Sequence, residues 1–256
     1  MTITRGEWQR VALFALLLIL LTSAPYWLAW SRAGTEWQFS GFLFGADDGY
    51  SYLGKMRLGV RGLWEFYLFY TPEPHASAPL TFLPYILPGQ IVRLFTSPAD
   101  PGATALLAGI FGLMRVIFDA LLIVVLYRFI AAFIASPAGR FRALLLATLG
   151  GGLGWVIALG GGLPPEFYIP EGFSFLILWG LPHLALARAA LLGALLLILQ
   201  MAQNEDEWRS RELGKDTHHR ATEKHRGFVH GNASILNASF ESISKAPSPL
   251  QWGGGL

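Results

Sequence analysis

The sequence has 256 residues, of which 53% are hydrophobic and only 14% are charged, with a net charge of +2. An ordinary soluble domain has about 25% charged residues, so this composition excludes that class and indicates a membrane protein. The chain has no cysteine, which excludes disulfide frameworks, thiolate metal sites and cysteine nucleophiles. The small positive charge lies largely beside hydrophobic segments, so it indicates membrane topology and not a nucleic-acid partner.

Four apolar segments are candidates for membrane spans. They cover residues 11–30, 105–135, 143–161 and 182–200. About 20 helical residues cross a hydrocarbon core of roughly 30 Å, and in lipid the backbone must satisfy its own hydrogen bonds. The sequence therefore predicts an all-α, polytopic membrane protein with about four transmembrane helices. The second segment is longer than one crossing requires, so we expect it to protrude.

Arginine pairs beside the predicted spans indicate the orientation of the chain. The pairs are Arg5 and Arg10, Arg140 and Arg142, and Arg209 and Arg211. Because basic residues are enriched in cytoplasmic loops, both termini are expected on the cytoplasmic side of a bacterial inner membrane. Residues 31–100 then form a long external loop. Within it, the proline-interrupted segment 80–95 predicts a helix that lies along the membrane interface.

The charge density rises abruptly at residue 203. The first 202 residues contain 12 Lys+Arg and 10 Asp+Glu, whereas the last 54 contain 7 of each. No hydrophobic period is sustained in this tail, so residues 203–256 are expected to be a polar and largely disordered cytoplasmic segment. The sudden end of membrane character also leads us to expect a truncated or frame-altered fragment of a longer protein.

The external loop contains the densest group of candidate functional residues, beginning with the adjacent carboxylates Asp47 and Asp48. Adjacent carboxylates repel, so one can act as a base, or both can bind a divalent cation such as Mg²⁺ or Mn²⁺. Tyr50 and Lys55 follow on the same predicted short helix. The alternative is that the acidic pair only caps this helix and stabilises its amino end through the macrodipole.

The order of these features resembles the amino-terminal part of the polyprenyl-phosphate-sugar-dependent glycosyltransferases of the C-type fold. The resemblance rests on a first span, an external loop opening with DDGYSYL, a Gly62–Trp64 element and a proline-rich interfacial helix, and covers about residues 8–202. YTPEPH at 70–75 and PH at 182–183 resemble motifs of bacterial integral membrane proteins related to this fold. The resemblance implies sugar transfer from a polyprenyl-phosphate donor on the external face, with the membrane lipid and this donor as partners. It implies a catalytic or metal-associated role for Asp47 or Asp48, with Asp47 the first choice as base.

Further polar residues on the predicted external side complete a hypothetical substrate site. Arg115 and Arg188 are candidates to bind the lipid phosphate, because guanidinium groups suit phosphate oxygens. The remaining candidates for the substrate site are Tyr50, Lys55, Glu73, His75, Glu171 and His183. Two structural alternatives stay open. Arg115 forms an ion pair with Asp119, four residues later. The long Arg188 side chain reaches out of the span, so that its guanidinium lies at the membrane interface.

Two other classes of function stay open beside the glycosyltransferase. One is a non-enzymatic membrane assembly or scaffold protein, or an inactive fragment. The other, a transporter, is less favoured because intramembrane charges are few and no repeat of spans is evident. The glycine run in GGGLGW at 150–155 indicates close helix packing, since no strand precedes it and no GK[ST] follows.

Overall fold

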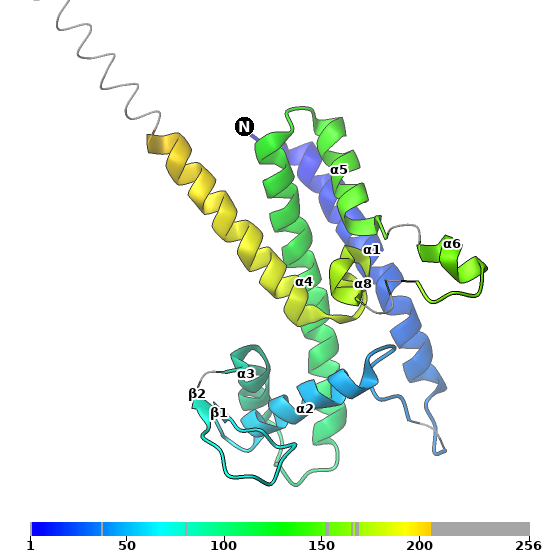
Figure 1. Ribbon diagram of the computed structural model, residues 1–256, viewed down its shortest axis with the longest axis vertical. Coiled ribbons are helices and arrows are strands. Elements are labelled where there is room, and N and C mark those ends of the chain that lie inside the picture. The colour runs from blue at the N-terminus through cyan, green and yellow to red at the C-terminus, as the bar shows by residue number, and fades with distance from the viewer. Residues whose placement is uncertain are drawn as a thin grey trace, which may run out of the picture. The chain divides into compact units, whose positions relative to one another are not determined.

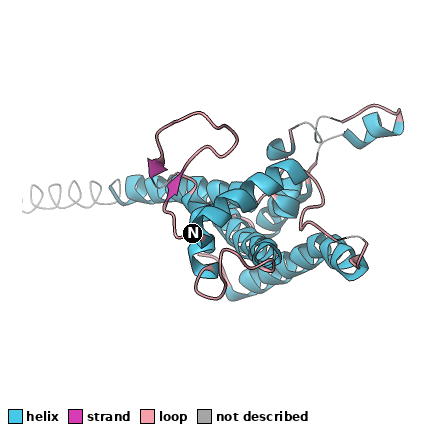
Figure 2. Cartoon of the chain, turned by 90° about the horizontal axis from the view of Figure 1, so that it is seen from below, coloured by secondary structure: helices cyan, strands magenta, loops and turns pink. Residues whose placement is uncertain are grey.

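The computed structural model describes residues 2–36, 38–79, 81–151, 154–164, 166 and 169–205. The rest of the predicted tail, residues 206–256, lies outside the described residues. The chain divides into two compact units, residues 1–196 and 197–256. The described residues 197–205 of the second unit are helical. The predicted all-α character is confirmed: the described chain is mostly helical, with one short pair of strands (Figures 1 and 2).

Three helices are long and apolar enough to cross a membrane: α1 (Arg5–Arg32), α4 (Ala103–Phe133) and the helix Pro182–Glu205. They confirm the helices predicted at 11–30, 105–135 and 182–200. The predicted span at 143–161 is instead divided between α5 (Pro137–Leu149), whose C-cap residue is Gly150, and α6 (Gly154–Leu159). Neither piece is long enough to cross alone. The count of four spans therefore stays a prediction.

Large apolar side chains cover the outer surface of α1. Leu13, Leu17, Leu21 and Trp27 are each more than half exposed, although this helix also contributes Val11 and Leu18 to the core. A continuous exposed apolar surface is unfavourable in water but is what a lipid-facing helix requires. The exposure pattern therefore agrees with the membrane assignment.

The segment predicted to form the external loop folds into two packed helices, α2 (Ala46–Val60) and α3 (Leu83–Val92), and a small antiparallel pair, β1 (Glu65–Phe66) and β2 (Ala78–Pro79). Two glycines allow α2 and α3 to meet almost backbone to backbone. A Cβ atom on Gly59 would lie 2.1 Å from the Ile86 carbonyl oxygen, and one on Gly89 would lie 1.9 Å from that of Met56. Side chains at these positions are therefore sterically excluded.

Helix α3 lies inside the segment predicted to form an interfacial helix. Leu94 and Phe95, just after its end, are 78% and 77% exposed, and Leu87 and Ile91 are also exposed. This apolar surface suits contact with the membrane interface. The helix is confirmed, and its place along the interface stays a prediction.

Two clusters of buried side chains hold the first unit together. One joins α1, α4, α5, the short helix α8 (Ser174–Gly180) and the start of the helix Pro182–Glu205, and it includes Leu18, Ile123, Leu144 and Ile177. The other joins α2 and α3 to the first turns of α4 through residues such as Met56, Tyr85, Leu107 and Phe111. Figure 1 shows α2 and α3 beside the end of α4 where that helix begins, away from α5. The candidate site forms at this end.

Candidate functional site

The acidic pair lies in the first turn of α2. The N-cap residue is Gly45, whose φ of 57° is in the left-handed region that glycine adopts without strain, and no side chain caps the helix. Asp47 and Asp48 are both exposed. Neither aspartate is the N-cap residue, so the acidic pair does not cap α2 through a side-chain hydrogen bond. Both carboxylates still stabilise the amino end of α2 through the macrodipole.

One face of α2 places Asp48, Tyr52 and Lys55 in a row, because positions i, i+4 and i+7 of a helix share a face. The Tyr52 ring stacks on Tyr85 of α3, with ring centroids 4.9 Å apart and the planes nearly parallel. Its hydroxyl lies 3.5 Å from Nε2 of His183, and the two ring centroids are 4.8 Å apart. We call Tyr52, Tyr85 and His183 the tyrosine–histidine cluster.

The tyrosine–histidine cluster contains two buried polar atoms without a hydrogen-bond partner in the described part of the chain, the Tyr85 hydroxyl and Nδ1 of His183. An unpaired buried polar group costs about 1–3 kcal/mol, so such groups are rare in native structures. They are more frequent at functional sites, where a polar ligand supplies the partner. The cluster is therefore a candidate for binding a polar group.

The charges of Asp48 and Glu171 act on this cluster. Burial raises the pKa of Tyr52 to about 12, and the negative charges of Asp48 and Glu171 add to this effect. Burial also raises the pKa of Tyr85, with smaller contributions from Tyr52 and Asp48. Asp48 and Glu171 act electrostatically on His183 as well. Both tyrosines are therefore neutral hydrogen-bond donors at physiological pH, with two carboxylates in electrostatic range.

Lys55 lies buried beside the same aromatic rings. Its Nζ donates a hydrogen bond of 2.8 Å to the Ser51 hydroxyl and lies 4.4 Å from the centre of the Phe82 ring and 5.2 Å from that of Tyr52. Burial lowers the pKa of Lys55, and the nearby Asp48 carboxylate partly opposes this shift. The ammonium group is thus stabilised by cation–π contacts and by Asp48.

Arg115 has buried partners on several helices. Its guanidinium donates to the hydroxyls of Thr22 at 3.1 Å and Ser23 at 2.6 Å, both on α1. It also lies 3.8 Å from the Asp119 carboxylate and 4.8 Å from the centre of the Tyr26 ring. The Arg115 and Asp119 side chains are only 5% and 1% exposed. This geometry agrees with the structural-pairing alternative, and it does not present Arg115 to a lipid phosphate.

Arg188 is half-buried at the edge of an apolar cavity. It donates 3.1 Å to the Ser174 hydroxyl and also bonds to the backbone carbonyl of Glu171. The cavity has a volume of about 280 Å³ and is lined mainly by leucines and alanine, with Thr148 and Ser174. A guanidinium at the rim of an apolar cavity suits the phosphate and hydrocarbon parts of a lipid.

Glu73 and His75 lie in the exposed loop between β1 and β2. The His75 ring accepts a hydrogen bond of 2.6 Å from the Leu68 backbone N–H through Nε2, and its Nδ1 donates 2.8 Å to the Glu73 carbonyl. Both ring nitrogens therefore stabilise the loop. In the described part of the chain, the hydrogen bonds of this loop do not connect these residues to Asp48 or His183.

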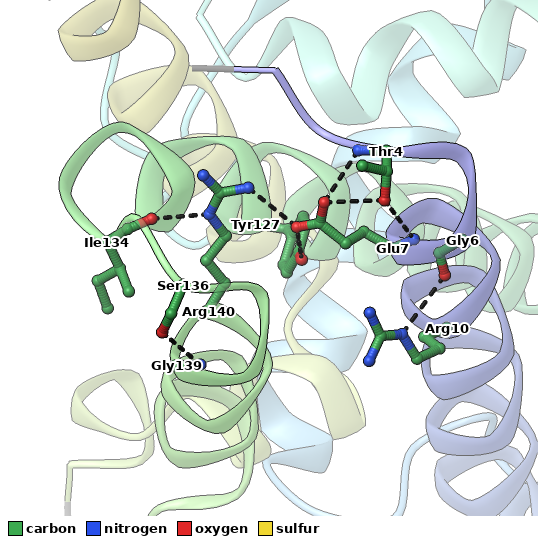
Figure 3. A network of polar contacts seen from close by, with 9 residues as sticks. All are labelled: Thr4, Gly6, Glu7, Arg10, Tyr127, Ile134, Ser136, Gly139 and Arg140. Atoms are coloured by element: carbon green, nitrogen blue, oxygen red, sulfur yellow. Dashed lines mark hydrogen bonds and ion pairs between the residues drawn. The ribbon is translucent and has the colours of Figure 1, made fainter.

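A second buried polar network lies at the other end of the first unit, where α1 begins and α4 ends (Figure 3). One oxygen of the Glu7 carboxylate accepts hydrogen bonds of 2.9 Å from both Arg140 and the Tyr127 hydroxyl. The other oxygen accepts from the backbone N–H and the hydroxyl of Thr4, completing a capping box. Arg140 also donates 2.7 Å to the Ile134 carbonyl. The sequence interpretation treated Arg140 only as a topology signal and missed this network, although the Thr4–Glu7 spacing is a capping signal.

Replacing Arg140 with Met is expected to lower accumulation in the membrane and to lower the apparent unfolding temperature by several degrees. The reason is that the buried Glu7 carboxylate would lose its cation. Arg142→Met is the matched control, because Arg142 lies two residues later and is exposed. Size-exclusion chromatography after heating would measure both variants. Equal thermal profiles for the two variants would contradict the structural role of the Glu7–Arg140 pair.

The described residues contain no group of three or more His, Cys, Asp or Glu side chains that could hold a metal ion. Asp47 and Asp48 alone offer two carboxylates. That number fits Mg²⁺, which is often bound through one or two carboxylates together with water and substrate phosphates. The acidic pair therefore fits a cation that arrives with a phosphate-bearing substrate.

The chain matches no protein-family model, no curated protein and no solved structure. Its function is therefore inferred from the chemistry of the site.

Proposed function

We propose that this chain is an integral membrane protein of the glycosyltransferase type, which transfers a sugar from a polyprenyl-phosphate donor on the external face of the bacterial inner membrane. One observation carries the proposal: Tyr52 contacts His183 from a distant part of the sequence, and three charged groups act on this contact. Asp48 and Lys55 lie on the same face of α2 as Tyr52, with the Lys55 Nζ 5.2 Å from the Tyr52 ring centre, and the charge of Glu171 acts on both Tyr52 and His183. A carboxylate close to neutral tyrosine hydroxyls and a histidine ring can bind and deprotonate a sugar hydroxyl.

In the proposed reaction, Asp48 accepts the proton of the acceptor hydroxyl. The acceptor oxygen forms a bond to the anomeric carbon of the donor sugar, while the bond from this carbon to the phosphate oxygen breaks. The polyprenyl phosphate leaves with the bonding electron pair, and the proton stays on Asp48 until solvent removes it. Tyr52, Tyr85 and His183 would orient the hydroxyl groups of the substrate.

A divalent cation would be held by the Asp47 carboxylate together with water and the donor phosphate, and it would neutralise charge on the leaving phosphate. Asp48 would then stay free to act as the base, because it lies on the face of α2 that carries Tyr52 and its charge acts on Tyr52.

The lipid donor would use the apolar cavity beside Arg188. The leucines suit the first isoprene units of the carrier, and the guanidinium suits the phosphate. Glu171, whose backbone carbonyl bonds to Arg188 and whose charge acts on Tyr52, would connect the two parts of the site. This arrangement reassigns the phosphate contact from Arg115, which is buried, to Arg188.

The proposal is tested by reconstituting the whole chain in lipid vesicles with radiolabelled polyprenyl-phosphate sugars and a membrane glycan extract as acceptor. We expect transfer of label to the acceptor that depends on the protein. Absence of transfer with glucosyl, mannosyl, galactosyl and arabinosyl donors, with and without Mg²⁺ or Mn²⁺, would overturn it for this chain.

The proposed orientation gives a separate prediction. A reporter protein fused after Gln203 is expected to be cytoplasmic, and one inserted near Pro74 is expected to be external, because the arginine pairs place both termini inside. Paired fusions to alkaline phosphatase, active outside, and a fluorescent protein, active inside, would measure this. Both reporters on one side of the membrane would separate the site from the external face and contradict the topology.

A membrane assembly or scaffold protein is the second candidate. It is favoured by the fact that Arg115 and Arg140 both bond within the protein, as the polar groups of a purely structural helical unit would. A scaffold would tolerate removal of the Asp48 carboxylate, whereas the enzyme would not.

A further inference from the structure

A second cavity lies on the other side of α2 from the tyrosine–histidine cluster. Its volume is about 460 Å³, which falls in the range of roughly 300–1,000 Å³ typical of small-molecule sites. The end of α1, the segment 33–40, the first turns of α2 and the start of α4 all contribute to its lining. Its aromatic and polar lining residues are Trp30, Gln38, Phe39, Ser40, Tyr50 and Thr104.

Edge-to-face contacts hold the aromatic walls of this cavity in place. The Phe39 ring contacts Trp30 at 5.6 Å and Tyr26 at 6.2 Å between centroids. On the opposite wall, Tyr50 contacts Phe42, whose ring lies 5.1 Å from that of Phe111 in α4. Such edge-to-face contacts stabilise the positions of the rings beyond simple burial. The exposed rings of Trp30 and Tyr50 are therefore anchored through a buried or half-buried neighbour.

Small residues on α4 create the hollow. Thr104, Ala105 and Ala108 lie along one side of this helix and line the cavity. Gly41, with a φ of 95°, brings the preceding segment against α4, because a Cβ atom there would lie 3.0 Å from Cβ of Ala108. The segment that carries Gln38, Phe39 and Ser40 is thus positioned by a close backbone approach.

The lining combines aromatic rings with neutral polar groups. Gln38 offers an amide, Ser40, Tyr50 and Thr104 offer hydroxyls, and Trp30 offers an indole N–H. No Asp, Glu, Lys or Arg is among the described residues that line it. A phosphate or an ammonium group would therefore lose hydration without gaining a counter-charge. A sugar ring, which has an apolar C–H face and a rim of hydroxyls, matches both parts of the lining.

We propose that this cavity binds a neutral sugar residue, with its C–H face against Trp30 or Tyr50 and its hydroxyls bonded to Gln38, Ser40 and Thr104. Binding itself follows from the lining. The further assignment, that the sugar is a unit of the acceptor glycan at some distance from the reacting one, rests on the proposed function.

The test uses the whole chain in lipid nanodiscs, because glycoside detergents would compete through their own sugar head groups. The probes are the methyl glycosides of glucose, mannose, galactose and N-acetylglucosamine, and saturation-transfer NMR reports contact with their ring protons. Ala105→Trp is expected to weaken binding at least about tenfold by filling the cavity, a loss of 1.4 kcal/mol. Leu106→Trp is the matched control, since Leu106 is the next residue, is exposed and does not line the cavity.

Binding that Ala105→Trp abolishes and Leu106→Trp preserves would support the proposal. No saturation transfer to any of the four glycosides, or equal transfer in the two variants, would overturn it. Thr104→Val, which removes one hydroxyl at nearly constant size, gives a second measurement and should weaken binding without altering the size-exclusion profile. Tighter binding of glucose 6-phosphate than of methyl glucoside would also overturn the neutral-sugar assignment.

The two proposals fail in distinguishable ways. Asp48→Asn should retain glycoside binding, because Asp48 does not line this cavity. Glycoside binding without any sugar transfer would leave the cavity proposal standing and remove the enzymatic one. Sugar transfer without glycoside binding would leave the enzymatic proposal standing and remove the cavity proposal.

Discussion

Replacing Asp48 with Asn is expected to reduce sugar transfer by about 10²–10⁴-fold, the range that a general base contributes. The amide preserves the size of the side chain and leaves the exposed first turn of α2 intact, so membrane insertion should not change. It cannot accept the proton of the acceptor hydroxyl. The measurement is the initial rate of label transfer in vesicles at matched protein content.

Asp47→Asn is the matched control, because Asp47 is exposed in the same helical turn and is not among the groups that act on the tyrosine–histidine cluster. We expect it to raise the Mg²⁺ concentration that gives half the maximal rate while retaining most of the maximal rate at saturating Mg²⁺. The sequence favoured Asp47 as the base, and the helical geometry is the reason for preferring Asp48. A double amide variant with the parental rate would show that the pair only stabilises α2, and the mechanism would be wrong.

The long helices were predictable because an uninterrupted apolar run leaves a helix as the only spanning structure that satisfies its own backbone. The segment 143–161 shows the limit of this reasoning. Its mean composition is as apolar as that of a span, but hydropathy does not report that α5 ends at Leu149 with Gly150 as its C-cap residue. Glycine loses more backbone entropy in a helix than other residues do, and this local cost decides where a helix stops.

Within the site, only contacts between residues of the same helix could be predicted from the sequence. The shared face of Asp48, Tyr52 and Lys55 and the pairing of Arg115 with Asp119 both follow from spacings of about four residues. The contact between Tyr52 and His183 joins positions 131 residues apart. It depends on how α2 and α3 pack at the start of α4, and the glycine contacts that fix this packing have no local signature. His75 shows what spacing alone does not reveal, since both of its ring nitrogens bond within its own loop, and its place in the substrate site stays a prediction.

Replacing Arg115 with Ala is expected to destabilise the protein by about 3–5 kcal/mol, because removing one partner leaves an uncompensated buried charge. Asp119 has no hydrogen-bond partner among the described residues, and Arg115 is the cation beside it at 3.8 Å. The hydroxyls of Thr22 and Ser23 would lose their donor as well. Accumulation in the membrane and the unfolding midpoint in denaturant would measure the loss, with Arg128→Ala as the control from an exposed position of α4.

The double variant Arg115→Met, Asp119→Leu decides whether the pair is only structural. Replacing both members of a buried ion pair with apolar side chains is often neutral or stabilising, so this variant should recover most of the stability lost in Arg115→Ala. If Arg115 only holds α4 against α1, the double variant should bind polyprenyl phosphate as the parent protein does. If it instead folds normally but loses carrier binding, and Arg115→Lys shows the same loss, Arg115 contacts the phosphate directly. In that case the buried position seen here is one state of the side chain, and the assignment of the phosphate to Arg188 is wrong.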